Sequence, residues 1–301
     1  MRVFFSPQYE VTLPGHVWPT SKYRLIKDRL MIKDRPSGPG VTLVVPPMAS
    51  WDDLALVHTS EYLAKLRDST LTPDDIATLE LPWRPEFADA FRLMVGGTAA
   101  AAAAAIEDGR AAHLGGGLHH AFAAHGEGFC PLNDVAVAIR VLQRDRRVAR
   151  AAVVDLDVHH GNGTAMIFDG DPSVFTFSIH QRHNYPVFKP RSDLDVGLED
   201  GADDDRYLTA LRGALPRVMA TTPEIVVYLA GADPFEGDQL GGVRLTKAGL
   251  RERDRLVVDA SARSGAALVV VLAGGYSADV HDTVDIHVGT MEVLLGRAAL
   301  D

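Results

Sequence analysis

The residues best suited to chemistry lie between positions 151 and 164, which read AAVVDLDVHHGNGT. Small and β-branched apolar residues at 151–154 predict a buried strand. Asp155, Asp157 and His159 follow at alternate positions, and alternate residues of an extended chain point to one side. Buried charges at this density are costly unless they are paired or bound to a metal. The stretch therefore predicts two carboxylates and an imidazole that emerge together at a strand end.

A metal ion at Asp157 and His159 needs a third ligand, and Asp233 is the natural candidate because it follows another predicted buried strand. Taken alone, Asp233 is more typical of a helix cap or a turn. Two carboxylates and one neutral imidazole balance a divalent cation, and three protein ligands leave room for water or substrate, as in catalytic sites. Without a thiolate ligand the predicted site is not strongly selective for Zn²⁺, and Fe²⁺ or Co²⁺ also fit.

A pair of histidines, His119 and His120, follows three glycines, which predicts an irregular loop that can aim both rings inward. Two imidazoles beside a metal favour general acid and base catalysis. Asp155 is the expected carboxylate that orients one ring, and Asn162 can hydrogen-bond the other without adding charge. The alternative for Asn162 is a plain turn residue between two glycines.

Two aromatic residues lie in glycine-rich turns, Tyr276 in AGGYS and Phe129 in GEGFC. The hydroxyl of Tyr276 can reach a carbonyl oxygen and stabilise developing negative charge. The alternative is an ordinary half-buried tyrosine. Phe129 can line an apolar slot or belong to the core.

The expected elements alternate along the chain, which predicts parallel βαβ units in one domain over residues 1–301. Strands are expected at 3–6, 41–45, 111–114, 151–154, 174–180, 225–230 and 267–273, and longer helices at 21–32, 85–107, 131–143, 206–220 and 247–264. Polar turns follow the later strands, and the carboxyl ends of parallel strands share one edge of a sheet. Residues far apart in the sequence are therefore expected to converge on one site.

The composition of the chain argues against several classes of protein function. The net charge of −10 argues against a nucleic-acid binder, which needs a basic face. The longest apolar run, residues 93–106, is shorter than a membrane span needs, and the N-terminus does not resemble a secretory signal. The single cysteine, Cys130, excludes an intrachain disulfide and fits a reducing compartment, so we expect a cytoplasmic protein with no membrane partner.

Five motifs, in their order and spacing, resemble the zinc-dependent histone deacetylase family of the arginase/deacetylase superfamily over nearly the whole chain. They are GGGLHHA, GFCPLND, DLDVHHGNGT, AGADPFEGDQLGG and LAGGYS. The stretches EGDQLGGVRLT and RHNYP most resemble the class IV branch and bacterial histone deacetylase-like amidohydrolases. The resemblance implies a single-domain α/β, three-layer fold with a central, mostly parallel eight-stranded sheet. It also implies hydrolysis of an acylated amine by Zn²⁺-activated water.

The resemblance also implies roles for individual residues. Asp157, His159 and Asp233 would bind Zn²⁺, or Fe²⁺ in its place. His120 would act as general base and then general acid, with Tyr276 polarising the carbonyl. His119, paired with Asp155, would give electrostatic support. The substrate-binding residues implied are Gly128, Phe129, Tyr185, Leu240 and Ser60. A structural K⁺ ion is implied near Asp155, Asp157, His159, Ser178 and Ile179.

Three positions carry expectations about specificity. Asn162 stands where class I enzymes have a second aspartate, which should retune the basicity of His120. Ser60, in VHTSEYL, stands where class I enzymes have an aspartate that holds the substrate's backbone amides, and a neutral serine would hold a peptide less firmly. Leu240 offers no charge partner for a second ammonium group, which lowers the expectation of a polyamine substrate and suits longer acyl chains.

The leading hypothesis is therefore a metal-dependent deacylase of N-acyl-lysine or a related acylated amine, with an acyl-lysine protein or peptide or a small acylated amine as substrate. A hydrolase of acetylpolyamines or other small acylated amines is the alternative of the same class. A non-catalytic acyl-lysine-binding module is the alternative of a different class. A dinuclear arginase-like hydrolase would need further metal-binding carboxylates, which the matching turns do not supply.

Overall fold

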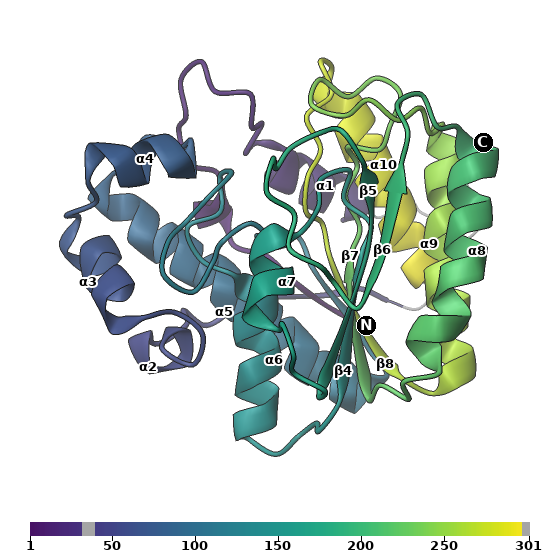
Figure 1. Cartoon of the computed structure of the whole chain (residues 1–301), viewed down its shortest axis with the longest axis horizontal. Helices are drawn as coiled ribbons and strands as arrows, with labels where there is room; N and C mark the ends of the chain where they lie inside the picture. The colour runs from purple at the N-terminus through teal and green to yellow at the C-terminus, as the bar shows by residue number, and fades with distance from the viewer. Residues whose placement is uncertain (32–39, 297–301) are drawn as a thin grey trace.

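The computed structural model describes residues 1–31 and 40–296. An eight-stranded sheet runs through the centre in the order β2-β1-β3-β8-β7-β4-β5-β6, and every neighbouring pair is parallel (Figure 1). The strands are β1 Arg2–Phe4, β2 Thr42–Val44, β3 Arg110–His113, β4 Ala151–Asp155, β5 Val174–Gln181, β6 Leu194–Leu198, β7 Ile225–Leu229 and β8 Ala267–Val271. The α/β fold expected from the sequence is confirmed, and its sheet is wholly parallel among the described residues.

Helices cover both faces of the sheet and form the outer two of three layers (Figure 1). The helices are α1 Lys22–Leu30, α2 Trp51–Leu54, α3 Ser60–Asp68, α4 Pro73–Leu79, α5 Pro85–Asp108, α6 Asp134–Arg144, α7 Asn162–Ile167, α8 Asp204–Met219, α9 Lys247–Ser264 and α10 Val280–Leu294. On one face α5 packs against α6, and α6 against α7; on the other, α9 packs between α8 and α10. The short helices α2, α3 and α4 lie outside α5 (Figure 1).

Helix α5 is the longest helix and the one described helix that is long and apolar enough to span a membrane. Its alanines are strong helix formers. Pro85 is its first residue, and Gly109, with a φ of 80°, caps its C-terminal end. Within its most apolar window, 67% of the residues are buried inside the protein. Packing against β3, β8 and α6 accounts for this composition, as expected of a core helix.

Strand β4 lies between β7 and β5 in the interior of the sheet, and all five of its residues are buried. This burial on both faces explains its unbroken apolar run. Asp155, its last residue, is in register with Leu229 of β7 and Ser178 of β5. The three turns that follow β4, β7 and β8 therefore leave the sheet beside one another, which is the convergence that the sequence predicts.

Strand β6 and helix α10 are two of the elements that the sequence did not predict. Strand β6 lies at the edge of the sheet, and only its first residue is buried. It also contains Gly197, so its sequence pattern is typical of an acidic loop. Helix α10 is buried over most of its length and is rich in β-branched residues, which hides the helical period. Both omissions come from the surroundings of the element rather than from its local residue preferences.

Candidate metal centre and active site

The side chains of Asp157, His159 and Asp233 meet at the carboxyl edge of the sheet. One ligand atom from each lies within 4.8 Å of the other two, and all three residues are buried. His159 Nδ1 lies 3.0 Å from Asp157 Oδ1 and 3.4 Å from Asp233 Oδ2. The expectation that these three distant residues share a site agrees with this geometry.

The electrostatics of this group favour a bound cation. Asp233 Oδ2 is buried and has no hydrogen-bond partner in the described part of the chain, although His159 lies close to it. Burial and the neighbouring Asp157 carboxylate raise the pKa of Asp233 to about 7. Burial opposes protonation of His159, but the adjacent Asp157 and Asp233 carboxylates outweigh it and raise its pKa to about 10. A buried oxygen without a hydrogen-bond partner and two adjacent carboxylates therefore fit a divalent cation.

Main-chain amides hold the two carboxylates in place. Asp157 accepts hydrogen bonds from the amides of His159 at 2.9 Å and Gly274 at 2.8 Å. Asp233 accepts one from the amide of Val158 at 2.9 Å. A Cβ atom on Gly274 would lie 1.9 Å from Asp233 Oδ2, so only glycine fits at this position. The three turns are thus locked together by the groups that would bind the metal.

The two adjacent histidines have different partners and different electrostatics. His119 Nδ1 lies 2.7 Å from Asp155 Oδ2, and His120 Nδ1 lies 2.8 Å from Asn162 Oδ1. Burial disfavours a charged His119, but the Asp155 carboxylate prevails and raises its pKa to about 9. Burial and the nearby charge of His119 hold the pKa of His120 well below its ordinary value. His120 is therefore the neutral ring, suited to accept a proton, beside a positively charged neighbour.

Asn162 also links this pair to a further carboxylate. Its Nδ2 donates to Glu127 Oε1 at 2.7 Å, which leaves its Oδ1 as the acceptor that faces His120. His120 Nδ1 must then carry the proton, and its Nε2 keeps the lone pair. The first residue of α7 thus fixes the tautomer that a general base needs.

The turn that carries Tyr276 is fixed from two sides. Its main-chain amide donates to Asp238 Oδ2 at 2.7 Å, and Lys22 Nζ donates to the Ala273 carbonyl at 3.0 Å. Lys22 is fully buried, and burial lowers its pKa to about 8 despite the Asp233 carboxylate nearby. Burial and the Asp157 carboxylate hold the pKa of Tyr276 well above its ordinary value, so its hydroxyl stays able to donate a hydrogen bond.

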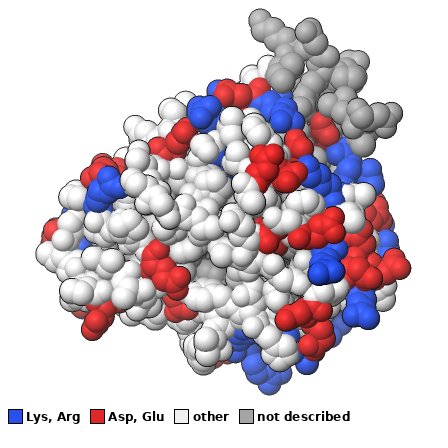
Figure 2. Space-filling view, turned by 90° about the horizontal axis from the view of Figure 1, so that it is seen from above, with Lys and Arg blue, Asp and Glu red and all other residues white. Residues whose placement is uncertain are grey.

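A cavity of about 170 Å³ leads to His120 and His159 from the carboxyl face of the sheet. Seen from above, this face has uncharged residues over its centre and charged side chains gathered mainly at one side (Figure 2). The residues lining the cavity are Glu80, His120, Gly128, Phe129, His159, Asn184, Tyr185, Leu240 and Tyr276. A second, smaller cavity of about 30 Å³ lies further in and shares His120, His159 and Tyr276 with the first.

Comparison with known protein families identifies the family of this chain. The histone deacetylase domain matches residues 16–291. The chain belongs to the histone deacetylase family. Its relatives support a hydrolase of the deacetylase and amidohydrolase class.

The relatives of this deacetylase-family chain carry names that indicate different substrates, or no known function. An uncharacterized protein of Picosynechococcus is 41% identical, over 99% of this chain and 98% of its own length. Histone deacetylase 2 of Arabidopsis thaliana is 30% identical over 91% of the chain and 74% of its own length. Polyamine deacetylase HDAC10 of Rattus norvegicus is 34% identical over 66% and 38%.

A solved structure agrees with the fold of this deacetylase-family chain. The HDA15 HD domain superposes with a TM-score of 0.80 at 26% identity, and covers 99% of this chain and 91% of its own. The superposition extends over the whole sheet and its helices, so the deacetylase architecture is shared.

The structure brings together most of the residues expected to bind substrate in this deacetylase-family chain. Gly128, Phe129, Tyr185 and Leu240 all line the 170 Å³ cavity. Ser60 does not line either of the two cavities described, because it is an exposed residue at the start of α3. Of the residues implied for K⁺, Asp155 at the end of β4 is in register with Ser178 of β5, and Asp157 and His159 follow in the next turn; the ion itself stays a prediction.

Several residues of the deacetylase site were missed by the sequence analysis. Glu80 lines the cavity from a left-handed position, with a φ of 54°, directly after α4. Lys22 comes from α1 and Asp238 from the turn after β7, and both hold the Tyr276 turn. A lone glutamate, lysine or aspartate has no motif of its own, and only the packing of distant elements reveals its role.

Proposed function

We propose that this chain is a metal-dependent amidohydrolase that removes acyl groups from lysine side chains or from small acylated amines. The observation that carries the proposal is the Asp233 oxygen without a hydrogen-bond partner, within the buried group of Asp157, His159 and Asp233 and beside the neutral ring of His120. These three residues would hold one divalent cation, Zn²⁺ or Fe²⁺. When bound, such a cation acidifies water and polarises a carbonyl group.

The protein's own residues perform the proton transfers. His120 Nε2 takes a proton from the attacking water as its oxygen bonds to the acyl carbon. Tyr276 donates a hydrogen bond to the carbonyl oxygen as negative charge develops there. His120 then passes its proton to the departing amine nitrogen, and the C–N bond breaks to give a carboxylate and a free amine. The positive charge on His119, held by Asp155, stabilises the negative charge of the attacking group.

Removal of the metal tests this proposal. Protein stripped with a chelator is expected to lose turnover of an acetyl-lysine peptide by at least about 100-fold, because several kcal/mol of stabilisation are lost. Adding Zn²⁺ or Fe²⁺ should restore the rate, with circular dichroism showing that the fold persists throughout. Full turnover by protein whose metal content is negligible by mass spectrometry would contradict the proposal. Binding of the peptide by metal-loaded protein without any turnover would instead favour the non-catalytic module.

A small cationic substrate is the second candidate, and Glu80 favours it. No hydrogen bond or ion pair reaches its carboxylate in the described residues, and it lies on the wall of the cavity. Burial and the Glu127 carboxylate raise its pKa, and the charges of His16 and His159 oppose this only in part. A second ammonium group on the substrate would supply this partner. Glu80 thus offers the charge that Leu240 does not.

Neutralising this carboxylate should change substrate preference. Glu80→Gln is expected to raise KM about tenfold for an acetylated diamine, because a charge-assisted hydrogen bond contributes about 1.4 kcal/mol. KM for an acetylated monoamine of the same length should stay within a factor of two. Steady-state kinetics with both substrates measure the effect, with Glu61→Gln, an exposed charge loss on α3, as the matched control. Equal changes for the two amines would argue against charge recognition.

Three further expectations stay predictions. They are the structural K⁺ ion, the cytoplasmic localisation and the extent of one catalytic domain over residues 1–301. Cys130 is buried, and burial raises the pKa of its thiol well above the ordinary value, which keeps the thiol unreactive.

A further inference from the structure

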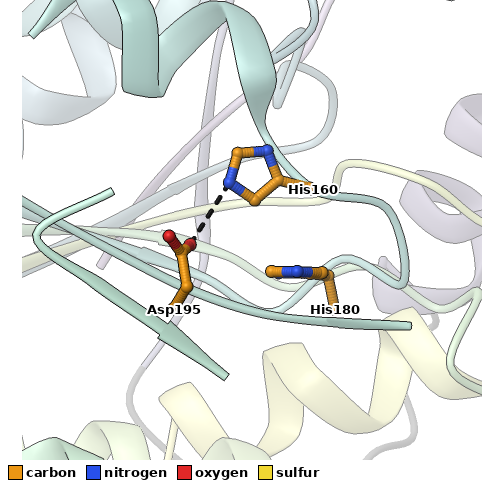
Figure 3. A group of neighbouring side chains, drawn as sticks. All are labelled: His160, His180 and Asp195. Atoms are coloured by element: carbon orange, nitrogen blue, oxygen red, sulfur yellow. Dashed lines mark hydrogen bonds and ion pairs between the residues drawn. The ribbon is translucent and has the colours of Figure 1, made fainter. Parts of the chain in front are cut away.

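A second group of side chains with metal-binding chemistry lies beside the proposed active site (Figure 3). His160, His180 and Asp195 each offer one ligand atom, and these atoms lie within 4.8 Å of one another. His160 follows β4, His180 is near the end of β5, and Asp195 belongs to the edge strand β6. The mechanism proposed above uses none of the three.

Strand geometry brings this group together. Asp195 is in register with Ser178, which lies two residues before His180, so these side chains share one face of the β5–β6 pair. His159 and His160 are consecutive, and His159 turns toward Asp157 while His160 turns toward Asp195. One short segment therefore supplies a ligand to each of two separate groups.

The contacts within the group resemble those around a metal ion. His160 Nε2 lies 3.2 Å from Asp195 Oδ1, close to the roughly 3.4 Å that separates neighbouring ligands of a tetrahedral zinc ion. The rings of His160 and His180 have centroids 4.7 Å apart and are nearly perpendicular. His180 Nδ1 lies 3.0 Å from Ser178 Oγ, and when that hydroxyl accepts its proton the lone pair of His180 is on Nε2.

The burial of the group is typical of an open site rather than of a closed one. His160 is fully buried and its Nδ1 has no hydrogen-bond partner among the described residues, so the ring is poorly satisfied as a purely structural group. His180 is also buried, whereas the Asp195 side chain is 31% exposed. Water can therefore reach the group on the side of Asp195 and complete a coordination shell.

We propose that His160, His180 and Asp195 bind a second divalent cation of the Zn²⁺ type. Two imidazoles and a carboxylate select borderline transition metals over K⁺, Mg²⁺ or Ca²⁺. By tying β6 to the segment that follows β4, the cation would also steady the loop over 182–193, which carries Asn184 and Tyr185 into the cavity wall.

This second site should bind more weakly than the first. It has one carboxylate instead of two, and the charges of Lys189 and Arg182 act on His180. Lys189 is directed to main-chain carbonyls of the same loop, and Arg182 is paired with Glu199. Their residual positive potential opposes a second cation. Occupancy is therefore expected to follow that of the first site as the metal concentration rises.

Titration calorimetry of the metal-free full chain with ZnCl₂ tests the proposal. Wild-type protein should take up two equivalents, the second at least tenfold more weakly than the first. His180→Gln should take up the tight equivalent alone and keep Zn²⁺-dependent deacylation. His183→Ala, an exposed histidine of the same loop, should take up both and serves as the matched control. Uptake of one equivalent by wild type, or of two with unchanged affinity by His180→Gln, would overturn the proposal.

Two further variants separate this result from the proposed function. Asp233→Asn should weaken the tight equivalent and abolish turnover while the weak equivalent persists. Asp195→Asn should remove the weak equivalent and covers the case in which His180→Gln fails to fold, as judged by circular dichroism. Loss of only the weak equivalent leaves the deacylase assignment intact, whereas a missing tight equivalent would contradict that assignment alone.

Discussion

Replacement of His120 by alanine is expected to lower kcat by about 10²- to 10⁴-fold, because a positioned acid–base group contributes rate enhancement of this size. The neutral ring accepts a proton from water and returns it to the amine. Among the described histidines, only His120 and His159 line both cavities, and His159 belongs to the metal group. Steady-state rates on an acetyl-lysine peptide measure the effect. Zn²⁺ uptake at the tight site should be retained, because His120 is not a member of the metal group.

His281→Ala is the matched control for this variant. His281 is exposed on α10 and lines neither of the two cavities described, so its loss should leave kcat within a factor of two. Retention of more than a tenth of wild-type kcat by His120→Ala would require another base and would refute the role assigned to this ring.

Tyr276→Phe is expected to lower kcat by about 10²- to 10³-fold with little change in KM, because the lost hydrogen bond forms to an oxygen that gains charge only in the transition state. Burial keeps this phenol protonated and therefore able to donate. The substitution removes one oxygen atom and preserves the ring that packs near Phe129 and His159. Separate determination of kcat and KM on one acylated amine distinguishes lost stabilisation from lost binding.

Tyr207→Phe gives the matched control for Tyr276→Phe. Tyr207 is a buried tyrosine of α8 outside the two cavities described, and its hydroxyl lies 3.5 Å from the Leu156 carbonyl. Its loss should leave both kinetic constants nearly unchanged. An increase in KM at constant kcat for Tyr276→Phe would show that this residue binds substrate without assisting the reaction.

The sequence predicted the fold class and the shared site because both follow from local pattern. Alternation after β4 puts Asp157 and His159 on one side, and parallel strands bring Asp233 to the same edge. The glycines before His119 and His120 similarly predict an irregular turn. These inferences need only strand periodicity and the rule that ligands gather at carboxyl ends of parallel strands.

The rim of the cavity could not be predicted in the same way. Ser60 was expected among the substrate-binding residues from the motif around it, and the structure places it on the surface at the start of α3, outside the two cavities described. Glu80 lines the cavity, because it directly follows α4 and its own left-handed backbone conformation turns the chain. Lys22 reaches the Tyr276 turn from a helix more than 200 residues away in sequence, as its contact with Ala273 shows. Such positions are set by tertiary packing and have no local signal.

The most direct measurement of the central claim is anomalous diffraction at the zinc edge from crystals of Zn²⁺-loaded protein. We predict one strong peak among Asp157, His159 and Asp233, with metal–ligand distances of about 2.0 to 2.2 Å. A weaker peak beside His160 should appear only at higher Zn²⁺ concentration. Absence of a peak among the three ligands, with Zn²⁺ shown to be bound to the crystallised protein, would contradict the account.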